Sequence, residues 1–285
     1  MATATLMNVL SPARKDGYAV GAFNILDYQS MKAVIDTAAS LSAPVIVQTS
    51  VKTVEYWGFR PMAGWYRELA GEAPVPVVLH LDHCKDAAFI RQCLDHGWTS
   101  VMIDASTKPF EENLTVSASV VDMAKPYQAG VEAELGAIVG VEDDIHVKQQ
   151  DAHLADVDQS VRFCRETGVD CFAPAVGTAH GIYKGEPKIA FDRLEAISKQ
   201  TVVPLALHGG TGLADGVFKR CISLGCAKIN ISTQLKYAFI DGFVRHHQAN
   251  PGQYNPLKVL DAQYGALVSG IREKMVLFGC AGKAS

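Results

Sequence analysis

The stretch "VPVVLHLD", residues 75–82, is an almost continuous apolar run that ends in polar and charged side chains. Apolar runs of this length, rich in Val and Leu, are typical of parallel strands that are covered on both faces. Burying a polar group without a partner costs roughly 2–7 kcal/mol, so His80, Asp82 and the adjacent His83 need partners. The stretch therefore predicts a buried strand whose carboxyl end lies in a polar site.

Similar runs recur along the whole chain and alternate with longer amphipathic segments. Strand and helix alternate eight times without a break in composition, which predicts an α/β fold, a single (β/α)8 or TIM barrel over residues 1–285. A doubly wound open sheet is the alternative, but no Gly-rich dinucleotide loop follows the first run. Besides 75–82, the predicted strands are 18–24, 44–50, 100–104, 130–136, 171–176, 203–209 and 228–233.

Apolar residues at helical spacing predict helices between these strands, for example over 28–41 and 156–167. The same spacing over 257–277 predicts an extra C-terminal helix that caps the barrel or makes a subunit contact. Residues 134–157 are too polar for a core strand and too irregular for a helix, so we expect a long loop there. It would follow the carboxyl end of a strand, where barrel enzymes place their chemistry.

Composition narrows the class of protein and its surroundings. The chain has 285 residues and a net charge of −4, and it contains no basic block of the kind that binds nucleic acid or an anionic membrane. No apolar run approaches the ~20 residues that span a bilayer, and the N-terminus lacks the apolar region of a signal peptide. Seven cysteines without a C-x-x-C pair predict free thiols and a cytoplasmic protein, with Cys84 packing rather than binding a metal.

Three histidines follow three different predicted strands: His83, His180 in "GTAHG" and His208 in "LALHGGTG". The carboxyl ends of barrel strands meet at one mouth, so these imidazoles are expected to lie close together. Three imidazoles with an open fourth position are the ligand set of a catalytic zinc. A single histidine in such a place is more often a hydrogen-bonded core residue, but three at equivalent points favour a metal site.

Strand alternation places residues 80 and 82 on one face and residue 81 on the other, with the strand ending at about residue 82 or 83. His80 and His83 then cannot both bind the metal, and His80 is expected to support the site by hydrogen bonding. Asp82 is placed to exchange a proton with a metal-bound substrate. The alternative is that Asp82 orients a ligand histidine.

Two glutamates on the fifth predicted strand, Glu132 and Glu134, share one face. If that face is the barrel interior, they need histidine, lysine or metal partners. Glu134 lies nearer the mouth and is predicted to support the metal or to bind it as an auxiliary group.

Two short loops predict a phosphate site. In barrels, the loops after the seventh and eighth strands often bind phosphate through backbone N–H groups and hydroxyls at the start of a helix. Such loops are formed here by "HGGTG" and "NIST", with Gly209, Gly210, Thr211, Gly212, Ser232 and Thr233 as the candidate contacts.

Taken together, the motifs resemble the class II, zinc-dependent ketose-bisphosphate aldolases, which comprise fructose- and tagatose-bisphosphate aldolases. The resemblance covers essentially the whole chain. It rests on "GAFN" (21–24), "PVIVQTS" (44–50), "HLDHC" (80–84), "VEAELG" (131–136), "GVEDD" (140–144), "GTAHGIYKGEPKI" (177–189), "LHGGTG" (207–212), "KINIST" (228–233) and the closing "FGCAGKA".

The resemblance implies a zinc ion on His83, His180 and His208, which acts as a Lewis acid on the ketose. Asp82 would protonate the aldehyde oxygen, and Glu142 would remove a proton from dihydroxyacetone phosphate. Without the resemblance, Glu142 would be read with its neighbours 143 and 144 as a solvated acidic run.

The resemblance further implies reversible cleavage of a ketose 1,6-bisphosphate to dihydroxyacetone phosphate and an aldehyde. The motif "VQTS" (47–50) favours fructose 1,6-bisphosphate, and the small Ser232 leaves tagatose 1,6-bisphosphate or another ketose 1-phosphate as alternatives. A Na⁺ or K⁺ ion near the phosphate and a homodimer or homotetramer are also implied. The implied substrate contacts are Asn24, Ser50, Gly181, Lys184, Gly209, Thr211, Asn230 and Thr233.

Three other functions are weighed against this one. A metal-dependent hydrolase commonly has an H-x-H pair on its first strand, and "AVGAFN" has none. A Schiff-base aldolase needs a lysine on a strand interior, and Lys228 is expected to precede the interior of the last strand. A non-catalytic sugar-phosphate-binding barrel would have no need of both Asp82 and Glu142.

Overall fold

The computed structural model describes residues 3–142, 145–147, 153–181, 183 and 185–284, with the backbone alone over 139–142 and 145–147. Eight strands form a closed barrel in the order β1-β11-β10-β8-β5-β4-β3-β2, and neighbouring strands are parallel. The predicted barrel is confirmed. Its strands are β1 Val20–Asn24, β2 Val45–Ser50, β3 Val77–Cys84, β4 Ser100–Ile103, β5 Gly130–Leu135, β8 Cys171–Pro174, β10 Leu205–Leu207 and β11 Cys226–Ile231.

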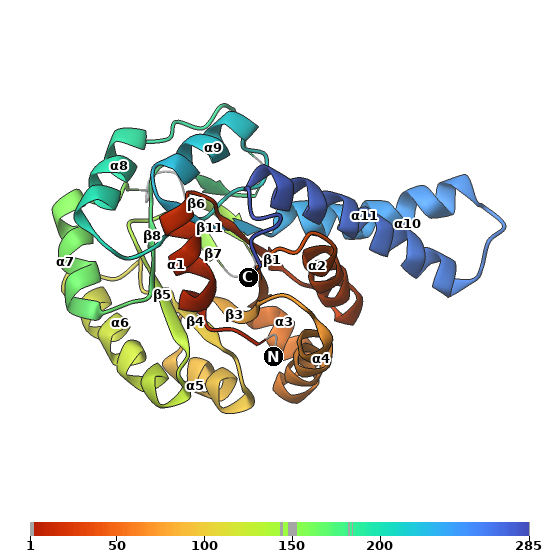
Figure 1. The fold of residues 1–285 in the computed structure, drawn as a ribbon, viewed down its shortest axis with the longest axis horizontal. Coiled ribbons are helices and arrows are strands. Elements are labelled where there is room, and N and C mark those ends of the chain that lie inside the picture. The colour runs from red at the N-terminus through yellow and green to blue at the C-terminus, as the bar shows by residue number, and fades with distance from the viewer. Residues whose placement is uncertain (1–2, 143–144, 148–152, 182, 184, 285) are drawn as a thin grey trace.

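Helices surround the barrel, as Figure 1 shows. Several begin at an aspartate whose side chain accepts a hydrogen bond from a backbone N–H of the first turn, as Asp27, Asp86 and Asp156 do. The helices are α1 Leu6–Asp16, α2 Tyr28–Ser40, α3 Val51–Trp57, α4 Phe59–Glu72, α5 Ala87–His96, α6 Phe110–Ala124, α7 Val157–Thr167, α8 Phe191–Gln200, α9 Asp215–Ser223, α10 Thr233–Ala249 and α11 Pro256–Leu277, with a 3₁₀ turn η1 at Lys125–Tyr127.

The helix α1 was not predicted, and it packs against β1, β5 and β11. Its buried face, formed by Leu6, Val9, Leu10 and Ala13, belongs to the same core as the residues between barrel and helices. Gly130 at the start of β5 permits this packing, because a Cβ atom there would lie 2.6 Å from the Cβ of Leu6.

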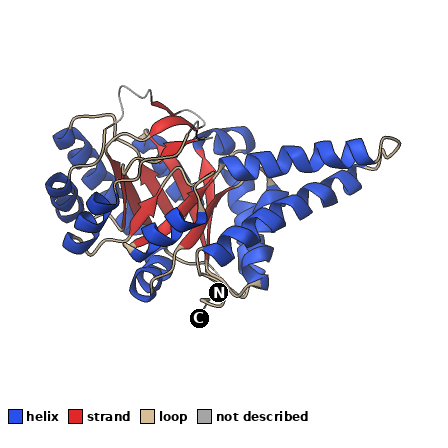
Figure 2. Cartoon of the chain, turned by 90° about the horizontal axis from the view of Figure 1, so that it is seen from above, coloured by secondary structure: helices blue, strands red, loops and turns tan. Residues whose placement is uncertain are grey.

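Two long helices, α10 and α11, project from the barrel as a helical hairpin (Figure 2), which we call the arm, residues 233–277. The predicted extra C-terminal helix is confirmed as α11. The last predicted strand, 228–233, is misplaced: β11 ends at Ile231, and Thr233 already belongs to α10. Gly242 brings the two helices of the arm together, because a Cβ atom there would lie 3.0 Å from the Cα of Gln263.

The predicted long loop contains strands that we did not expect. β6 (Val139–Glu142) pairs with β7 (Ile145–Val147) in antiparallel fashion and with β9 (Ala179–His180) in parallel fashion. The expectation of irregular structure was wrong there because Val and Ile alternate with other residues on both segments, a pattern that favours strands. The small sheet β7-β6-β9 holds the backbone of His180, which pairs with Gly140.

Candidate active site

The three predicted histidines come together at the mouth of the barrel. His83 lies on β3, His180 on β9 and His208 directly after β10. The ring centroids of His83 lie 5.1 Å from those of His180 and 4.7 Å from those of His208. One ring nitrogen from each of the three histidines lies within 4.8 Å of those of the other two. Zinc–nitrogen bonds of about 2.0–2.1 Å place tetrahedral ligand nitrogens roughly 3.3–3.4 Å apart. Three imidazoles with ligand atoms within 4.8 Å of one another therefore suit a zinc ion, which would draw the rings closer together.

His83 reaches the site through an irregularity at the end of β3. Strict alternation would direct residues 82 and 83 to opposite faces. Instead, His83 has a φ of 47°, and the register between β3 and β4 shifts between Leu81 and Cys84. The strand continues to Cys84, so the predicted end at 82 or 83 was wrong. The shift explains how Asp82 and His83, neighbours in sequence, both reach the polar interior.

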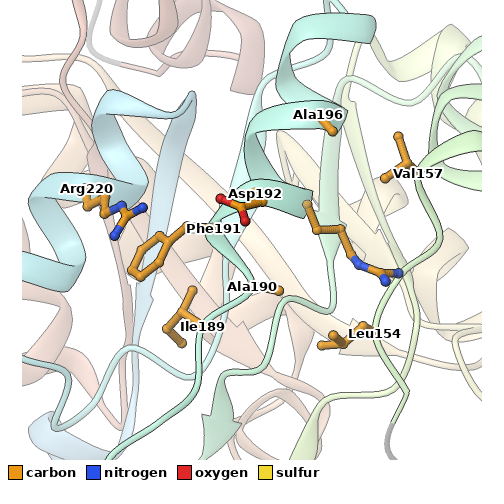
Figure 3. Close-up of a pocket in the computed structure, with 9 residues that line it drawn as sticks. Leu154, Val157, Ile189, Ala190, Phe191, Asp192, Ala196 and Arg220 are labelled. Carbon is orange, nitrogen blue, oxygen red and sulfur yellow. The ribbon is translucent and has the colours of Figure 1, made fainter.

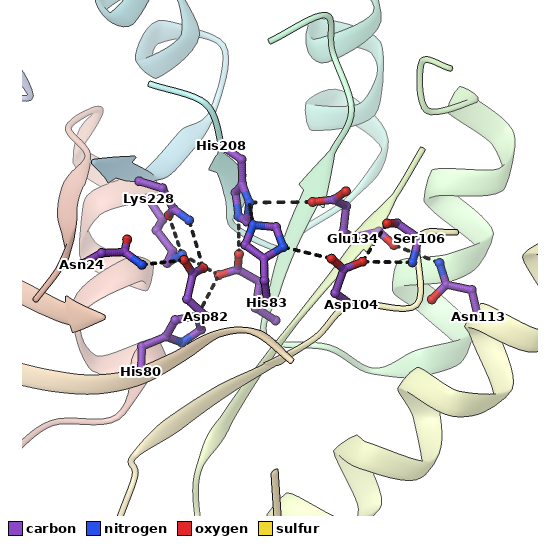
Figure 4. A network of polar contacts seen from close by, with 12 residues as sticks. Asn24, His80, Asp82, His83, Asp104, Ser106, Asn113, Glu134, His208 and Lys228 are labelled. Atoms are coloured by element: carbon purple, nitrogen blue, oxygen red, sulfur yellow. Dashed lines mark hydrogen bonds and ion pairs between the residues drawn. The ribbon is translucent and has the colours of Figure 1, made fainter. Parts of the chain in front are cut away.

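Asp104 forms a hydrogen bond with the ring of His83, as Figure 4 shows. Its Oδ2 accepts a hydrogen bond from His83 Nδ1 at 3.0 Å, and its Oδ1 accepts one from Ser106 Oγ at 2.6 Å. Burial alone would raise the pKa of Asp104, but His83 and Ser106 hold that pKa below its usual value. Burial opposes protonation of His83, yet Asp82 and Asp104 raise the pKa of this histidine to about 10.

Asp104 was missed by the sequence reasoning. The available signal was the same one that identified Asp82, namely an aspartate directly after the apolar run "SVMI". Asp104, and not Asp82, makes the hydrogen bond to a ring nitrogen of His83, whereas Asp82 accepts from Asn24.

His208 is held by the two glutamates of β5. Its Nε2 donates to Glu132 Oε1 at 2.7 Å, while its Nδ1 lies 2.9 Å from His83 Nε2 and 3.7 Å from Glu134 Oε2. Burial lowers the pKa of His208, and burial together with Asp104 raises the pKa of Glu134 well above its usual value. The two glutamates share one face of β5, as their spacing predicted, and that face is the barrel interior.

His80 lies one contact further from the histidine cluster than expected. Its Nδ1 shares a hydrogen bond of 2.7 Å with Ser100 Oγ, and its Nε2 lies 3.9 Å from Glu132 Oε2. Burial and the nearby Lys228 lower its pKa well below the usual value. His80 therefore lies next to Glu132, which in turn contacts His208 of the histidine cluster.

Asp82 is fixed by amides on both of its oxygens. Oδ2 accepts from Asn24 Nδ2 at 2.9 Å, and Oδ1 accepts from Asn230 Nδ2 at 3.3 Å. Asn24 is itself oriented by Gln48, whose Nε2 donates to Asn24 Oδ1 at 2.8 Å. The structure thus brings Asp82 together with two of the residues that were predicted to contact substrate.

The loop after β10 makes close backbone contacts that only glycine permits. Gly209 has a φ of +67°, and a Cβ atom there would lie 2.4 Å from the carbonyl oxygen of Ala179. Thr211 Oγ1 accepts a hydrogen bond from the backbone N–H of Gln234 at 3.3 Å, so the loop lies against the first turn of α10. This is the arrangement of loop and helix start that binds anions.

The remaining predicted contacts lie around this mouth or outside the described residues. Ser50 pairs in register with Asp82, and it caps α3 by accepting from the N–H of Thr53. Gly181 directly follows β9 and has a φ of +86°. Lys184 lies outside the described residues, and so does the side chain of Glu142, whose backbone belongs to β6.

Lys228 lies within β11, and its side chain is fully buried in the barrel. The expectation that it precedes the strand interior was wrong, because β11 begins at Cys226, two residues earlier than predicted. Its Nζ lies 3.0 Å from Glu132 Oε2. The seven cysteines are free, as predicted, and all of them are buried.

A separate surface pocket of about 590 Å³ lies beside α8 (Figure 3). Leu154, Phe191, Arg193 and Arg220 are among the residues that line it. None of the predicted site residues that the structure describes contributes to this lining, so the pocket is not part of the histidine site. None of the helices in the described part of the chain has the length and apolarity needed to cross a membrane.

The protein has the architecture of a barrel enzyme: a closed parallel barrel with histidines and acidic residues at the mouth formed by the carboxyl ends of its strands. Comparison with known proteins narrows the class. The family model described as "Fructose-bisphosphate aldolase class-II" matches residues 4–283. The chain belongs to this family, and it is an aldolase, a lyase that breaks a carbon–carbon bond.

Relatives agree with this assignment over nearly full length. The chain is 41% identical over 276 residues to the D-tagatose-1,6-bisphosphate aldolase subunit GatY of Klebsiella oxytoca, covering 97% of each chain. It is 38% identical over 288 residues to a fructose-bisphosphate aldolase of Geobacillus stearothermophilus, covering 100% of each. The crystal structure of the YdjI aldolase of Escherichia coli K12 is similar with a TM-score of 0.88 at 33% identity, covering 99% of this chain and 100% of that one.

Proposed function

We propose that the protein is a zinc-dependent aldolase that cleaves fructose 1,6-bisphosphate reversibly to dihydroxyacetone phosphate and glyceraldehyde 3-phosphate. The observation that carries this proposal is the cluster of His83, His180 and His208, with ligand atoms within 4.8 Å of one another, in a barrel of the class II aldolase family.

A zinc ion held by these three imidazoles would supply a Lewis acid for the ketose carbonyl. Two acidic residues support its ligands: Asp104 accepts from His83, and Glu132 accepts from His208. Carboxylates behind metal-binding histidines fix the ring orientation and the nitrogen that carries the proton. The ring nitrogens facing each other, His83 Nε2 and His208 Nδ1, are thereby the ones available as ligands.

Asp82 is proposed to move the proton of the bond-breaking step. In cleavage, its carboxylate takes the proton of the C4 hydroxyl while the C3–C4 bond breaks, and the bonding pair stays on the dihydroxyacetone phosphate fragment. In condensation, the same carboxyl group returns the proton to the aldehyde oxygen. The amides of Asn24 and Asn230 keep the carboxylate oriented for this transfer.

Glu142 is proposed as the second proton carrier, which protonates C3 of the triose fragment after cleavage and removes that proton in condensation. The backbone supports this role, because Glu142 ends β6 and β6 pairs with β9, the strand of His180. The base and one metal ligand would therefore be held by one small sheet.

The phosphate of dihydroxyacetone phosphate is proposed to bind at the loop after β10 and the start of α10. Backbone N–H groups at the start of a helix suit an anion. Its contacts would be Gly181, Lys184, Gly209, Thr211 and Thr233, with Asn24, Ser50 and Asn230 near the rest of the substrate and a Na⁺ or K⁺ ion beside the phosphate.

Tagatose 1,6-bisphosphate is the second candidate substrate. It is favoured by the small Ser232 at the end of β11 and by the similarity to the GatY subunit. Fructose 1,6-bisphosphate is favoured by "VQTS" on β2 and by the similarity to the Geobacillus enzyme. A ketose phosphate with another acceptor fragment would place no demand on a distal phosphate site.

The test is to measure kcat/KM for both bisphosphates and for a ketose 1-phosphate, before and after metal removal. We expect fructose 1,6-bisphosphate to give the highest value, EDTA to abolish cleavage, and zinc to restore it. A higher kcat/KM for tagatose 1,6-bisphosphate would make that sugar the preferred substrate. Cleavage that survives complete metal removal would refute the zinc assignment.

We also propose that the enzyme is a cytoplasmic homodimer or homotetramer that associates through the arm. Large apolar side chains remain exposed along both helices of the arm and at the turn between them, and contiguous exposed apolar surface commonly marks an interface. These side chains are Tyr237, Ile240, Phe243, Val244, Tyr254, Leu257, Leu260 and Val276.

A further inference from the structure

Lys228 is a buried ammonium group that neither proton transfer uses. It is completely inaccessible to solvent, and removing such a charge from water costs several kcal/mol unless partners compensate. Its Nζ makes an ion pair of 3.0 Å with Glu132 Oε2 and donates a hydrogen bond of 2.6 Å to Asn230 Oδ1. Glu132 also contacts His208, and Asn230 also contacts Asp82; Figure 4 shows His208 and Asp82 in the same network as Lys228.

The first contact reaches the metal ligands. Glu132 uses Oε2 for Lys228 and Oε1 for His208 Nε2, at 3.0 Å and 2.7 Å. The ion pair therefore fixes the rotation of the carboxylate that accepts from His208. Because Nε2 carries the proton in this hydrogen bond, Nδ1 keeps its lone pair and faces His83.

The second contact reaches the carboxylate proposed for proton transfer. Lys228 and Asn230 are two residues apart on β11, so both side chains point into the barrel. An amide can present either its oxygen or its NH₂ group to a neighbour. Because Lys228 binds the oxygen, the NH₂ group of Asn230 is directed at Asp82 Oδ1, 3.3 Å away.

We propose that Lys228 is a positioning residue that sets both sides of the site at once. Through Glu132 it fixes His208 with Nδ1 available to the metal, and through Asn230 it fixes the amide that orients Asp82. This inference rests on the proposed function, because it assumes a metal on the three histidines and a proton carrier at Asp82.

The test compares Lys228→Met, which keeps the length of the side chain without its charge, with Lys274→Met as a matched control. Lys274 is also buried, but it lies on α11 beside Glu273, away from the site. Zinc dissociation constants of the metal-free proteins are measured by competition with a chelator. We expect the constant to rise about 10-fold to 100-fold for Lys228→Met, as for other losses of support behind a metal ligand. It should be unchanged for Lys274→Met.

The kcat of the zinc-saturated enzyme tests the contact that runs through Asn230 to Asp82. We expect Lys228→Met to lose at least about tenfold in kcat at full zinc occupancy, because Asp82 loses an oriented donor. A lysine that only stabilises the fold would lower the melting temperature and leave zinc affinity and kcat unchanged, and that result would overturn the inference. If the unaltered protein binds no zinc, the proposed function fails instead.

A second pair of variants applies if Lys228→Met does not fold, because that variant leaves Glu132 as an unpaired buried charge. Glu132→Gln and the double variant Glu132→Gln/Lys228→Met are then compared. We expect the double variant to bind zinc no more weakly than Glu132→Gln, since Lys228 acts on His208 through Glu132, and to have a lower kcat through the loss at Asn230. Equal kcat values in the two proteins would contradict the positioning role.

Discussion

The barrel interior and the arm depart from the usual distribution of side chains in opposite directions. In the interior, His80, Glu132 and Lys228 are fully buried. On the arm, Ile240 and Leu257 are 58% and 67% exposed. Charged residues are seldom fully buried unless they are paired, and large apolar residues seldom remain in contiguous exposed groups without a partner.

The difference shows what each region is built for. In the interior, Asp82 and Lys228 have partners within the chain. Hydrogen bonds run from Gln48 through Asn24 to Asp82, Asn230 joins Asp82 to Lys228, and Glu132 joins Lys228 to His208. On the arm, large apolar side chains stay exposed, and in our proposal a second subunit covers them. Substitutions in the barrel interior and in the arm test this difference.

The largest effect is expected at Asp82. Asp82→Ala should lower kcat by about 100-fold to 10,000-fold, since it removes the proposed proton carrier, while zinc content stays near that of the unaltered protein. Steady-state kinetics and elemental analysis of the same preparation check both statements. Loss of zinc in this variant would make Asp82 a part of the metal site instead.

A smaller effect is expected at Asp104. Asp104→Asn removes the charge behind His83 and should weaken zinc binding about 10-fold to 100-fold. Asp170→Asn is the control, because Asp170 also accepts a hydrogen bond, from the N–H of Val131, before the start of β8. Equal zinc affinities for the two variants in chelator competition would refute the orienting role of Asp104.

The loop after β10 and the turn of the arm are expected to differ in how they tolerate a substituted glycine. Gly209→Ala adds a Cβ atom 2.4 Å from the oxygen of Ala179 at a φ of +67°. We expect it to lower the free energy of unfolding by about 1–3 kcal/mol. Gly252→Ala, in the turn of the arm, adds a Cβ atom with nothing within 4 Å and should change it by less than about 0.5 kcal/mol. Chemical denaturation measures the free energy of unfolding of both variants. Equal values for the two would show that the loop after β10 tolerates a side chain at residue 209, contrary to the prediction.

The smallest expected effect concerns association through the arm. Ile240→Glu should weaken self-association by at least about 1 kcal/mol, a fivefold change, because it places a charge in the proposed interface. Val202→Glu is the control, since Val202 is an apolar residue outside the arm and is 91% exposed. Light scattering after size-exclusion chromatography measures both, and identical oligomer distributions would argue against the arm as the interface.

The barrel and its histidine cluster could be predicted from the sequence because they depend on repeated patterns. Buried parallel strands produce apolar runs, and strand ends meet at one mouth, so His83, His180 and His208 were grouped without knowledge of their coordinates. That Glu132 and Glu134 share one face followed from the two-residue period of a strand.

Local exceptions to those patterns could not be predicted. The left-handed backbone at His83 and the register shift beside it leave no mark in an apolar pattern. Asp104 was missed because a lone aspartate after a strand is common, and its partner His83 is 21 residues away in sequence. Lys228 was predicted to lie at the start of the last strand, although it lies inside β11. The first two residues of β11, Cys226 and Ala227, lack the bulky apolar side chains by which the strand was recognised.

The central claim is a zinc ion bound by three histidines from β3, β9 and the end of β10. Anomalous diffraction at the zinc edge from crystals of the zinc-loaded protein tests it most directly. We predict one peak at about 2.0–2.1 Å from a ring nitrogen of each of His83, His180 and His208. A zinc peak bound to other residues, or no peak at these rings in zinc-saturated crystals, would contradict the account.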